Sequence, residues 1–277
     1  MNTRLLAACG AVVLVVGLAG GIAWWSRPDM TPAPVDLGTD DLPVPPIPPR
    51  IADGPRYDEC MTMLLEDPEG ADALATAWQA SGGGDAAAHC QALAKIAAGD
   101  SEEGAKMLET LAHAARADNV IRVVLLSQAT QARLMADQPD PAIKDATEGL
   151  AISPDDPDLL IGRATAYESV GDNRAAMDDL NQALLADETR GDAFVLRAAI
   201  WRQMDMLTEA RSDIDKAIAL DPDDAEALLE RGILRQLLGD LSGARADWIR
   251  ARDLDPESET AELAAQNLTL LDAGPKK

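Results

Sequence analysis

The chain has few of the residues that carry most catalytic and metal chemistry. Among its 277 residues are two histidines and three cysteines, and aromatic residues make up only 3%. No CxxC or HxxxH spacing indicates a metal site, and neither histidine stands in a motif with a serine and a carboxylate. Gly82-Gly83-Gly84 lacks the Lys-Ser/Thr that follows in a phosphate-binding loop. We therefore predict that the protein is not an enzyme and has no cofactor and no metal site.

Basic residues are scarce as well. The chain has 24 lysines and arginines against 48 acidic residues, which gives a net charge of −24. A nucleic-acid-binding domain carries a basic stripe, and none is found here, so we expect no nucleic-acid partner. The acidity is typical of an elongated surface kept soluble by charge, and attraction of a basic partner is the alternative reading.

After the first 25 positions, alanine and leucine dominate and residues that favour strands are sparse. Alanine and leucine are strong helix formers, whereas β-branched and aromatic residues favour strands. The composition therefore predicts an all-α fold.

An uncharged stretch of 21 residues runs from Leu5 to Trp25. As a helix it is about 31 Å long, enough to cross the hydrocarbon core of a bilayer. Arg4 makes the preceding flank positive, which favours a cytoplasmic N-terminus. We predict that residues 1–27 anchor the protein once in the inner membrane, with its body in the periplasm. Alternatively, cleavage near Ala23 releases the body into the periplasm.

Proline is concentrated after this stretch. Residues 28–55 contain nine of the chain's seventeen prolines. Proline fixes φ and removes a backbone donor, so this segment is expected to be an extended, semi-stiff spacer.

A 34-residue period runs through the second half of the chain. Four windows of this length, without gaps, begin at Val123, Pro157, Gly191 and Ala225, and repeat positions are counted from these residues. Position 20 is alanine in every window: Ala142, Ala176, Ala210 and Ala244. Position 8 is small or nearly so: Thr130, Ala164, Ala198 and Gly232. Small residues at fixed points allow two helices to approach closely.

This pattern resembles the tetratricopeptide repeat (TPR) family, whose 34-residue units are helix–turn–helix pairs. Gly171-Asp172 and Gly239-Asp240 match the family's turn between the two helices, and Tyr167 matches its aromatic position 11. The chain departs from the pattern at Glu188, where the family has proline, and at Gln138-Pro139 in the first turn. The resemblance implies a TPR-like α-solenoid of the membrane-anchored bacterial envelope type, preceded by one transmembrane helix and a Pro-rich linker.

We predict five segments from these patterns. They are the anchor (1–27), the linker (28–54), degenerate TPR-like helical pairs (55–119), four TPR units (120–258), and a C-terminal capping helix and tail (259–277). Within the degenerate segment, helices are expected at 57–66, 69–80, 85–97 and 102–116. A capping helix covers the apolar side that the last unit of a stack leaves open.

Cys60 and Cys90 are the cysteines of the body. Aligning Trp78 with Leu108 places them at the same point of neighbouring first helices. If the body lies in an oxidising compartment, they are expected to form a disulfide, provided that their Cα atoms lie within about 7 Å. Two buried free thiols are the alternative.

In the TPR family, the first helices of the units line a concave face that binds a peptide or a partner helix. The resemblance transfers this role to the following residues: Gln131, Met135, Ile161, Thr165, Glu168, Val195, Ala199, Arg202, Leu229, Ile233 and Gln236. The set is apolar with an acidic rim, and Arg202 is its only basic member. We therefore expect an apolar or basic peptide rather than a C-terminal carboxylate.

These observations predict a non-enzymatic scaffold or assembly factor that binds a protein or peptide. An accessory protein of cytochrome c maturation or of outer-membrane assembly has a similar layout. Two further hypotheses stay open: a structural envelope protein that associates into a homo-oligomer, and an enzyme with a dispersed site that includes His89 or His113.

Overall fold

Thirteen α-helices and no strand make up residues 49–114 and 118–274, which the computed structural model describes. The helices are α1 (Pro55–Glu66), α2 (Pro68–Ala80), α3 (Gly84–Ala97), α4 (Ser101–Ala112), α5 (Asn119–Met135), α6 (Pro139–Ile152), α7 (Pro157–Ser169), α8 (Asn173–Ala186), α9 (Gly191–Gln203), α10 (Leu207–Leu220), α11 (Ala225–Leu237), α12 (Leu241–Leu254) and α13 (Glu259–Ala273). The all-α prediction is confirmed for these residues. The predicted helix over 102–116 ends earlier, at Ala112, because the Ala114 N–H bonds to the Leu111 carbonyl three residues back and closes a turn.

The predicted anchor and nearly all of the Pro-rich linker lie outside the described residues. In the part of the chain that the structure does describe, no helix combines the length and the apolar character that a membrane span requires.

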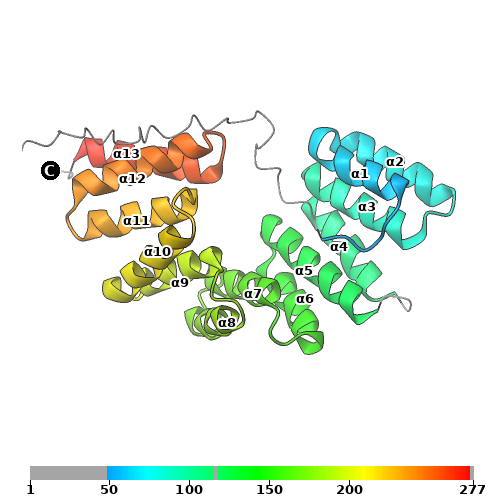
Figure 1. Ribbon diagram of the computed structural model, residues 1–277, viewed down its shortest axis with the longest axis horizontal. Helices are drawn as coiled ribbons and strands as arrows, with labels where there is room; N and C mark the ends of the chain where they lie inside the picture. Colours follow the sequence, from blue (N-terminus) through cyan, green and yellow to red (C-terminus); the bar gives the residue numbers. More distant parts are fainter. Residues whose placement is uncertain (1–48, 115–117, 275–277) are drawn as a thin grey trace, which may run out of the picture. The chain divides into compact units, whose positions relative to one another are not determined.

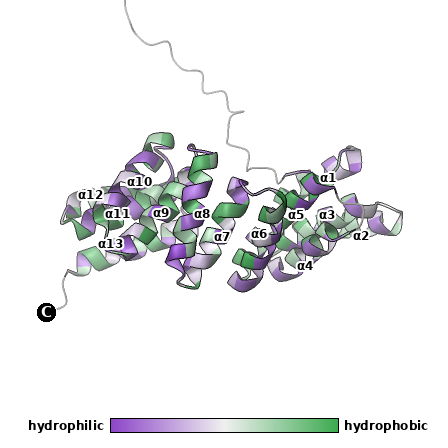
Figure 2. Ribbon diagram, turned by 90° about the horizontal axis from the view of Figure 1, so that it is seen from below, coloured by the Kyte–Doolittle hydropathy of each residue, from purple (hydrophilic) through white to green (hydrophobic). Residues whose placement is uncertain are grey.

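Consecutive helices pack against each other along the whole described chain, and their order in space follows their order in the sequence (Figure 1). The first helices of neighbouring pairs also touch, in the series α5, α7, α9, α11 and α13. Figure 2 shows hydrophobic and hydrophilic residues side by side on the helices of the stack. The result is a helical stack whose first helices lie next to one another.

The turn inside each of the four regular pairs has the same backbone conformation. Position 15 has a positive φ in all four: 53° at Asp137, 80° at Gly171, 61° at Asp205 and 87° at Gly239. Glycine adopts this conformation without a steric penalty, and aspartate tolerates it better than most residues. The departure of the first and third turns from the Gly-Asp pattern therefore leaves the turn geometry unchanged.

The four alanines at position 20 are fully buried, so they occupy equivalent places in successive pairs. Positions 8 and 24 face each other and compensate in size. Gly232 lies under the ring of Trp248, and a Cβ atom on this glycine would come within 2.3 Å of the indole Nε1. In the preceding two pairs alanine stands at position 8, with Leu180 or Ile214 at position 24. The combined volume of the side chains at positions 8 and 24 therefore sets how closely the two helices of a pair pack.

A ladder of arginine–aspartate pairs links the two helices of three successive units. Arg163, Arg197 and Arg231 at position 7 donate two hydrogen bonds each to Asp179, Asp213 and Asp247 at position 23, over 2.7–3.0 Å. The carboxylates are almost completely buried. We call these three pairs the ladder. The side chain of Asp179 points into the stack, although the adjacent Asp178 is exposed.

The first regular unit has the aspartate of the ladder without its arginine. Asp145 is 1% exposed, but Ala129 stands where the other units have arginine. The nearest cation is Arg133, whose Nε lies 3.6 Å from the carboxylate. Burial raises the pKa of Asp145 to about 6, and the nearby Glu109 carboxylate adds to this effect. An ionised Asp145 is therefore a net cost to the folded state at neutral pH.

Replacing Asp145 with asparagine is expected to stabilise the protein at pH 7 by about 3 kcal/mol, since a pKa raised to about 6 disfavours the ionised folded state. The wild type recovers this cost as the pH falls through 6 towards 4, because its folded state binds the proton first. The advantage of the variant should therefore shrink over this range in urea-unfolding curves. If the variant is less stable at pH 7, the charge of Asp145 stabilises the fold through Arg133, and the prediction is wrong.

The structure contains a disulfide between Cys60 of α1 and Cys90 of α3, whose Cα atoms are 6.2 Å apart. Next to it, four hydrogen bonds form a ring that begins and ends at the last linker residues. The Ile51 N–H donates to the Tyr57 hydroxyl, which donates to His89 Nδ1 over 2.7 Å. His89 Nε2 donates to Gln128 Oε1 over 2.7 Å, and the Gln128 amide donates to the Pro49 carbonyl. The ring fixes the point where the linker meets α1, α3 and α5.

In a neutral His89, Nε2 donates to Gln128 Oε1 and Nδ1 accepts from the Tyr57 hydroxyl, so both ring nitrogens have matching partners. The histidine is fully buried, and burial lowers its pKa to about 4. The unfolded chain binds the proton near pH 6.5, so stability should fall as the pH drops from 6.5 towards 4, by about 3 kcal/mol.

Urea unfolding of the wild type and of His89→Gln at pH 7, 5.5 and 4.5 measures this contribution. The wild type should lose more stability than the glutamine variant over this range, although Asp145 opposes the trend in both proteins. Equal losses would show that His89 does not titrate in this way.

Candidate protein-binding face

The side chains of α5, α7, α9, α11 and α13 that point away from the second helices form one continuous surface, because these helices contact one another in series. We call this surface the groove face. The residues of the groove face occupy the same positions in each repeat. The 34-residue period therefore places residues that are far apart in the sequence next to one another.

The predicted site residues differ in how far they reach the surface. Gln131 and Met135 are exposed, and Val195 is buried. The others are half-buried: Ile161, Thr165, Glu168, Ala199, Arg202, Leu229, Ile233 and Gln236. Leu229 and Ile233 pack against the buried cluster around Leu228 and Trp248, so they support the fold as well as the surface.

One hollow of about 510 Å³ opens on the groove face between α9, α11 and α13. Val195, Leu229 and Leu263 form its apolar floor, one from each helix, and Glu226 and Glu259 stand beside them. We call this space the C-terminal hollow. It brings together Val195 and Leu229 of the predicted set.

The carboxylates around the C-terminal hollow repel one another. Although Glu226 is exposed, partial loss of its solvent raises its pKa, and the charges of Asp224, Asp192 and Glu259 raise it further. Removing a carboxylate from water and placing like charges nearby both disfavour ionisation. A cation placed among these groups would relieve the repulsion.

Arg202, the only basic residue of the predicted set, has a partner inside the protein. Its guanidinium donates to the carboxylate of Glu230, with 2.5 Å between Nε and Oε1. Glu230 is 6% exposed; burial raises its pKa, while Arg202 opposes this shift. The arginine therefore compensates a buried charge, and its positive charge does not dominate the groove face.

The C-terminal helix α13, predicted only to cap the stack, also lines the C-terminal hollow. Ala264 and Leu268 pack against Trp248 and Leu228, while Leu263 and Glu259 face the hollow. The signal was present in the sequence, because Leu263 follows Leu229 by 34 residues.

No protein-family model and no curated protein matches the sequence. Among solved structures, a thermophilic TPR protein of Thermus thermophilus has a TM-score of 0.57 and 17% identity, covering 67% of this chain and 100% of that chain. A TPR protein from Parabacteroides merdae has a TM-score of 0.51 and 16% identity, covering 79% of this chain and 75% of that chain. The Cut9–Hcn1 hetero-tetramer of the APC/C has a TM-score of 0.64 and 12% identity, covering 78% of this chain and 42% of that chain.

The fold is therefore that of TPR proteins: a solenoid of helix–turn–helix repeats. The expected resemblance to the TPR family is supported by structure, at identities that show the fold alone.

Proposed function

We propose that the protein is a non-catalytic scaffold whose groove face binds an extended segment of a protein partner. The observation that carries this proposal is the C-terminal hollow, where an apolar floor and mutually repelling carboxylates converge from three helices. Apolar pockets supply affinity for side chains, and surrounding charge selects among partners. A segment with a basic side chain flanked by apolar residues fits this combination.

The charges around the C-terminal hollow favour a basic segment over an acidic one, because Arg202 is paired and, among the described residues, Glu226 and Glu259 are not. Because this guanidinium is held by Glu230, which also lines the C-terminal hollow, the pair adds no net charge beside Glu226 and Glu259. Within the described part of the chain, neither glutamate forms an ion pair with a lysine or arginine. An acidic segment would meet like charges there, which costs several kcal/mol at an interface.

We also propose where the protein resides in the cell. The uncharged run from Leu5 to Trp25 supports a single inner-membrane anchor with a periplasmic body, of the envelope type. The Cys60–Cys90 disulfide supports an oxidising compartment, where such bonds persist. Labelling with a membrane-impermeant thiol reagent tests this in cells: a cysteine introduced at exposed Leu185 should react from outside, and protection would contradict the topology.

Selection from a random-peptide display library on the full-length protein in detergent tests the binding function. Enrichment of sequences with lysine or arginine next to aliphatic residues is expected. The variant Glu226→Lys/Glu259→Lys should select a different, non-basic set. No enrichment, or the same set from both proteins, would contradict the proposal.

A further inference from the structure

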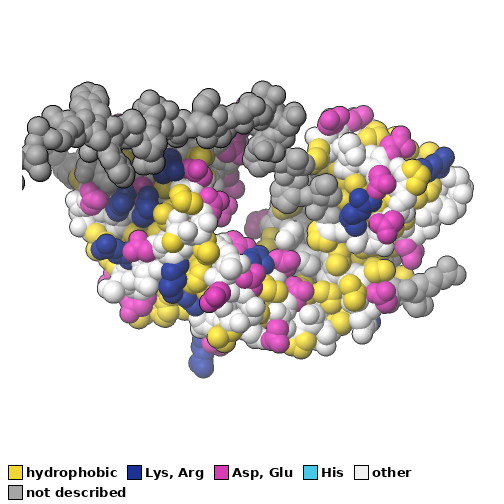
Figure 3. Space-filling model, in the orientation of Figure 1, with side chains coloured by type: hydrophobic (Ala, Val, Ile, Leu, Met, Phe, Trp, Pro, Cys, Tyr) yellow, Lys and Arg dark blue, Asp and Glu magenta, His cyan; other side chains and the backbone are white. Residues whose placement is uncertain are grey.

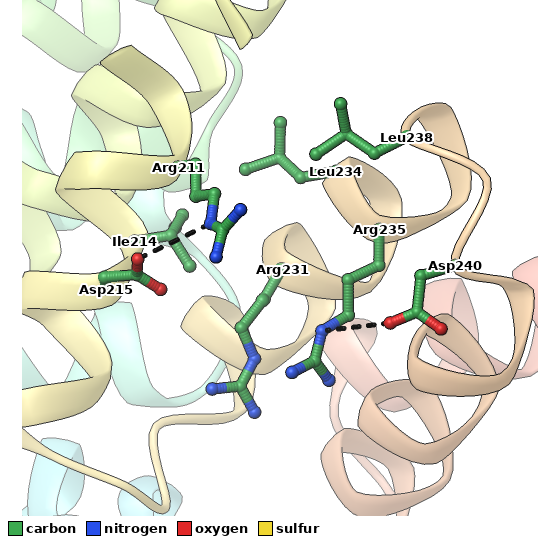
Figure 4. A pocket seen from close by; sticks show the side chains of 8 residues that line it. All are labelled: Arg211, Ile214, Asp215, Arg231, Leu234, Arg235, Leu238 and Asp240. Carbon is green, nitrogen blue, oxygen red and sulfur yellow. Dashed lines mark ion pairs between the residues drawn. The ribbon is translucent and has the colours of Figure 1, made fainter. Parts of the chain in front are cut away.

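A second pocket, of about 250 Å³, lies between α10 and α11, apart from the groove face. Ile214, Leu234 and Leu238 form its apolar side. Figure 4 shows the guanidinium groups of Arg231 and Arg235 near one another, while that of Arg211 lies apart from them, beside Asp215. Figure 3 shows that lysines and arginines gather over the C-terminal helices on one side of this otherwise acidic protein.

The repeat register explains why this interface has a pocket. At the preceding interface, position 21 is Met177 and position 11 of the next unit is Trp201, and both pack into one apolar cluster. At the pocket, the same two positions are Arg211 and Arg235. Two apolar side chains are thus replaced by two charged ones: Arg211 is largely exposed and Arg235 turns to Asp247, so neither fills the space between the helices.

The same comparison shows hydrogen-bond donors that have lost their usual acceptor. The Nη1 atoms of Arg163 and Arg197 donate to Thr147 and Asn181 of the preceding unit, over 3.1 and 2.8 Å. The equivalent acceptor of Arg231 is Asp215, and within residues 49–114 and 118–274 no hydrogen bond joins the two. Asp215 instead lies 3.7 Å from Arg211 Nε, which is longer than a hydrogen bond.

We propose that this pocket binds a carboxylate carried on an aliphatic group. Guanidinium groups offer pairs of parallel donors that match a planar carboxylate. The guanidinium of Arg211 lines the pocket and forms no hydrogen bond within the described residues, whereas Arg231 donates from Nε and Nη2 to Asp247 and has Nη1 left. The apolar wall fits a short aliphatic chain. A volume of about 250 Å³ lies below the usual range for drug-sized ligands, which favours a group the size of one amino-acid residue.

Nearby acidic residues set the affinity of this site. Asp247 is held by Arg231 and Arg235, while Asp240 and Asp215 lie at the rim, 3.9 and 3.7 Å from their arginines. A bound carboxylate would compete with the two rim groups for the guanidiniums. Removing the charge of Asp215 should therefore tighten binding.

Two probes test the chemistry: N-acetyl-leucine, which carries a carboxylate, and N-acetyl-leucinamide, which is its neutral counterpart. Saturation-transfer NMR titrations of the full-length protein in detergent should show at least tenfold tighter binding of the acid. 4-Methylpentanoate, added as a third arm, distinguishes a free aliphatic acid from a peptide chain end. Equal binding of acid and amide, or binding of neither, would overturn the proposal.

Variants locate the site. Arg211→Met and Arg235→Trp introduce the residues of the preceding interface and should weaken binding of the acid at least tenfold, while Asp215→Asn should strengthen it severalfold. Arg174→Met removes an exposed arginine of α8 and should have no effect. Circular dichroism verifies that each variant is folded. Unchanged binding in folded Arg211→Met, or the same loss in Arg174→Met, would overturn the assignment.

Discussion

Replacing Asp179 with alanine is expected to lower the free energy of unfolding by about 3–5 kcal/mol, because the change leaves a largely buried guanidinium without its counter-charge. Arg163 donates to both oxygens of this carboxylate, over 2.7 and 2.8 Å. The side chains of the pair are 19% and 8% exposed, so water replaces the lost partner poorly.

The neighbouring residue supplies a matched control. Asp178 is exposed, and its replacement with alanine should change stability by less than about 0.5 kcal/mol. A double variant, Arg163→Leu/Asp179→Leu, removes both charges and should recover most of the stability, since apolar residues often replace a buried ion pair without loss. Guanidinium unfolding curves measure all three. Equal effects of the two alanine substitutions would show that the ladder does not stabilise the stack.

Exchanging Glu226 and Glu259 for lysine is expected to lower the affinity for a basic peptide obtained by display about 30-fold or more, because like charges across an interface repel. The same change should leave the fold intact or stabilise it, since Glu226 is repelled by Asp192, Asp224 and Glu259 in the wild type. Loss of binding together with a gain in stability separates a functional effect from unfolding. Fluorescence anisotropy of the labelled peptide and urea unfolding measure the two quantities.

The control for this variant carries the same change in net charge elsewhere. Asp178 and Glu209 are exposed residues of α8 and α10, which are second helices. Lysine at both positions should weaken binding of the peptide much less than the Glu226→Lys/Glu259→Lys change does. A similar loss in the two variants would attribute binding to net charge alone, and retained binding in the groove variant would place the peptide elsewhere.

The sequence predicted the features that depend on a repeated pattern of residue size. The alanines at position 20 and the small residues at position 8 predicted helix pairs that pack closely, and all four alanines are buried. The pattern worked because close packing permits only a few side-chain volumes at those points. The turns at Asp137 and Asp205 were harder to predict, because only the backbone shows that aspartate adopts the glycine conformation there.

The polar contacts of the stack were not predicted from sequence. Asp178 and Asp179 are adjacent and chemically identical, yet one is exposed and the other is buried against Arg163. Arginine at position 7 and aspartate at position 23 do recur at the 34-residue period, and this recurrence was the available signal. The pairing of Arg202 with Glu230 has no such signal, because it joins two units at positions that the other units do not share.

Photo-crosslinking in intact cells tests the binding role of the groove face most directly. A photoreactive amino acid is placed at Leu263 in the C-terminal hollow or at Leu185, which is 88% exposed on the second helix α8. We predict a discrete protein adduct from Leu263 that is absent from Leu185 and disappears in the Glu226→Lys/Glu259→Lys background. The same adducts from both positions, or none from Leu263, would contradict a binding role for the groove face.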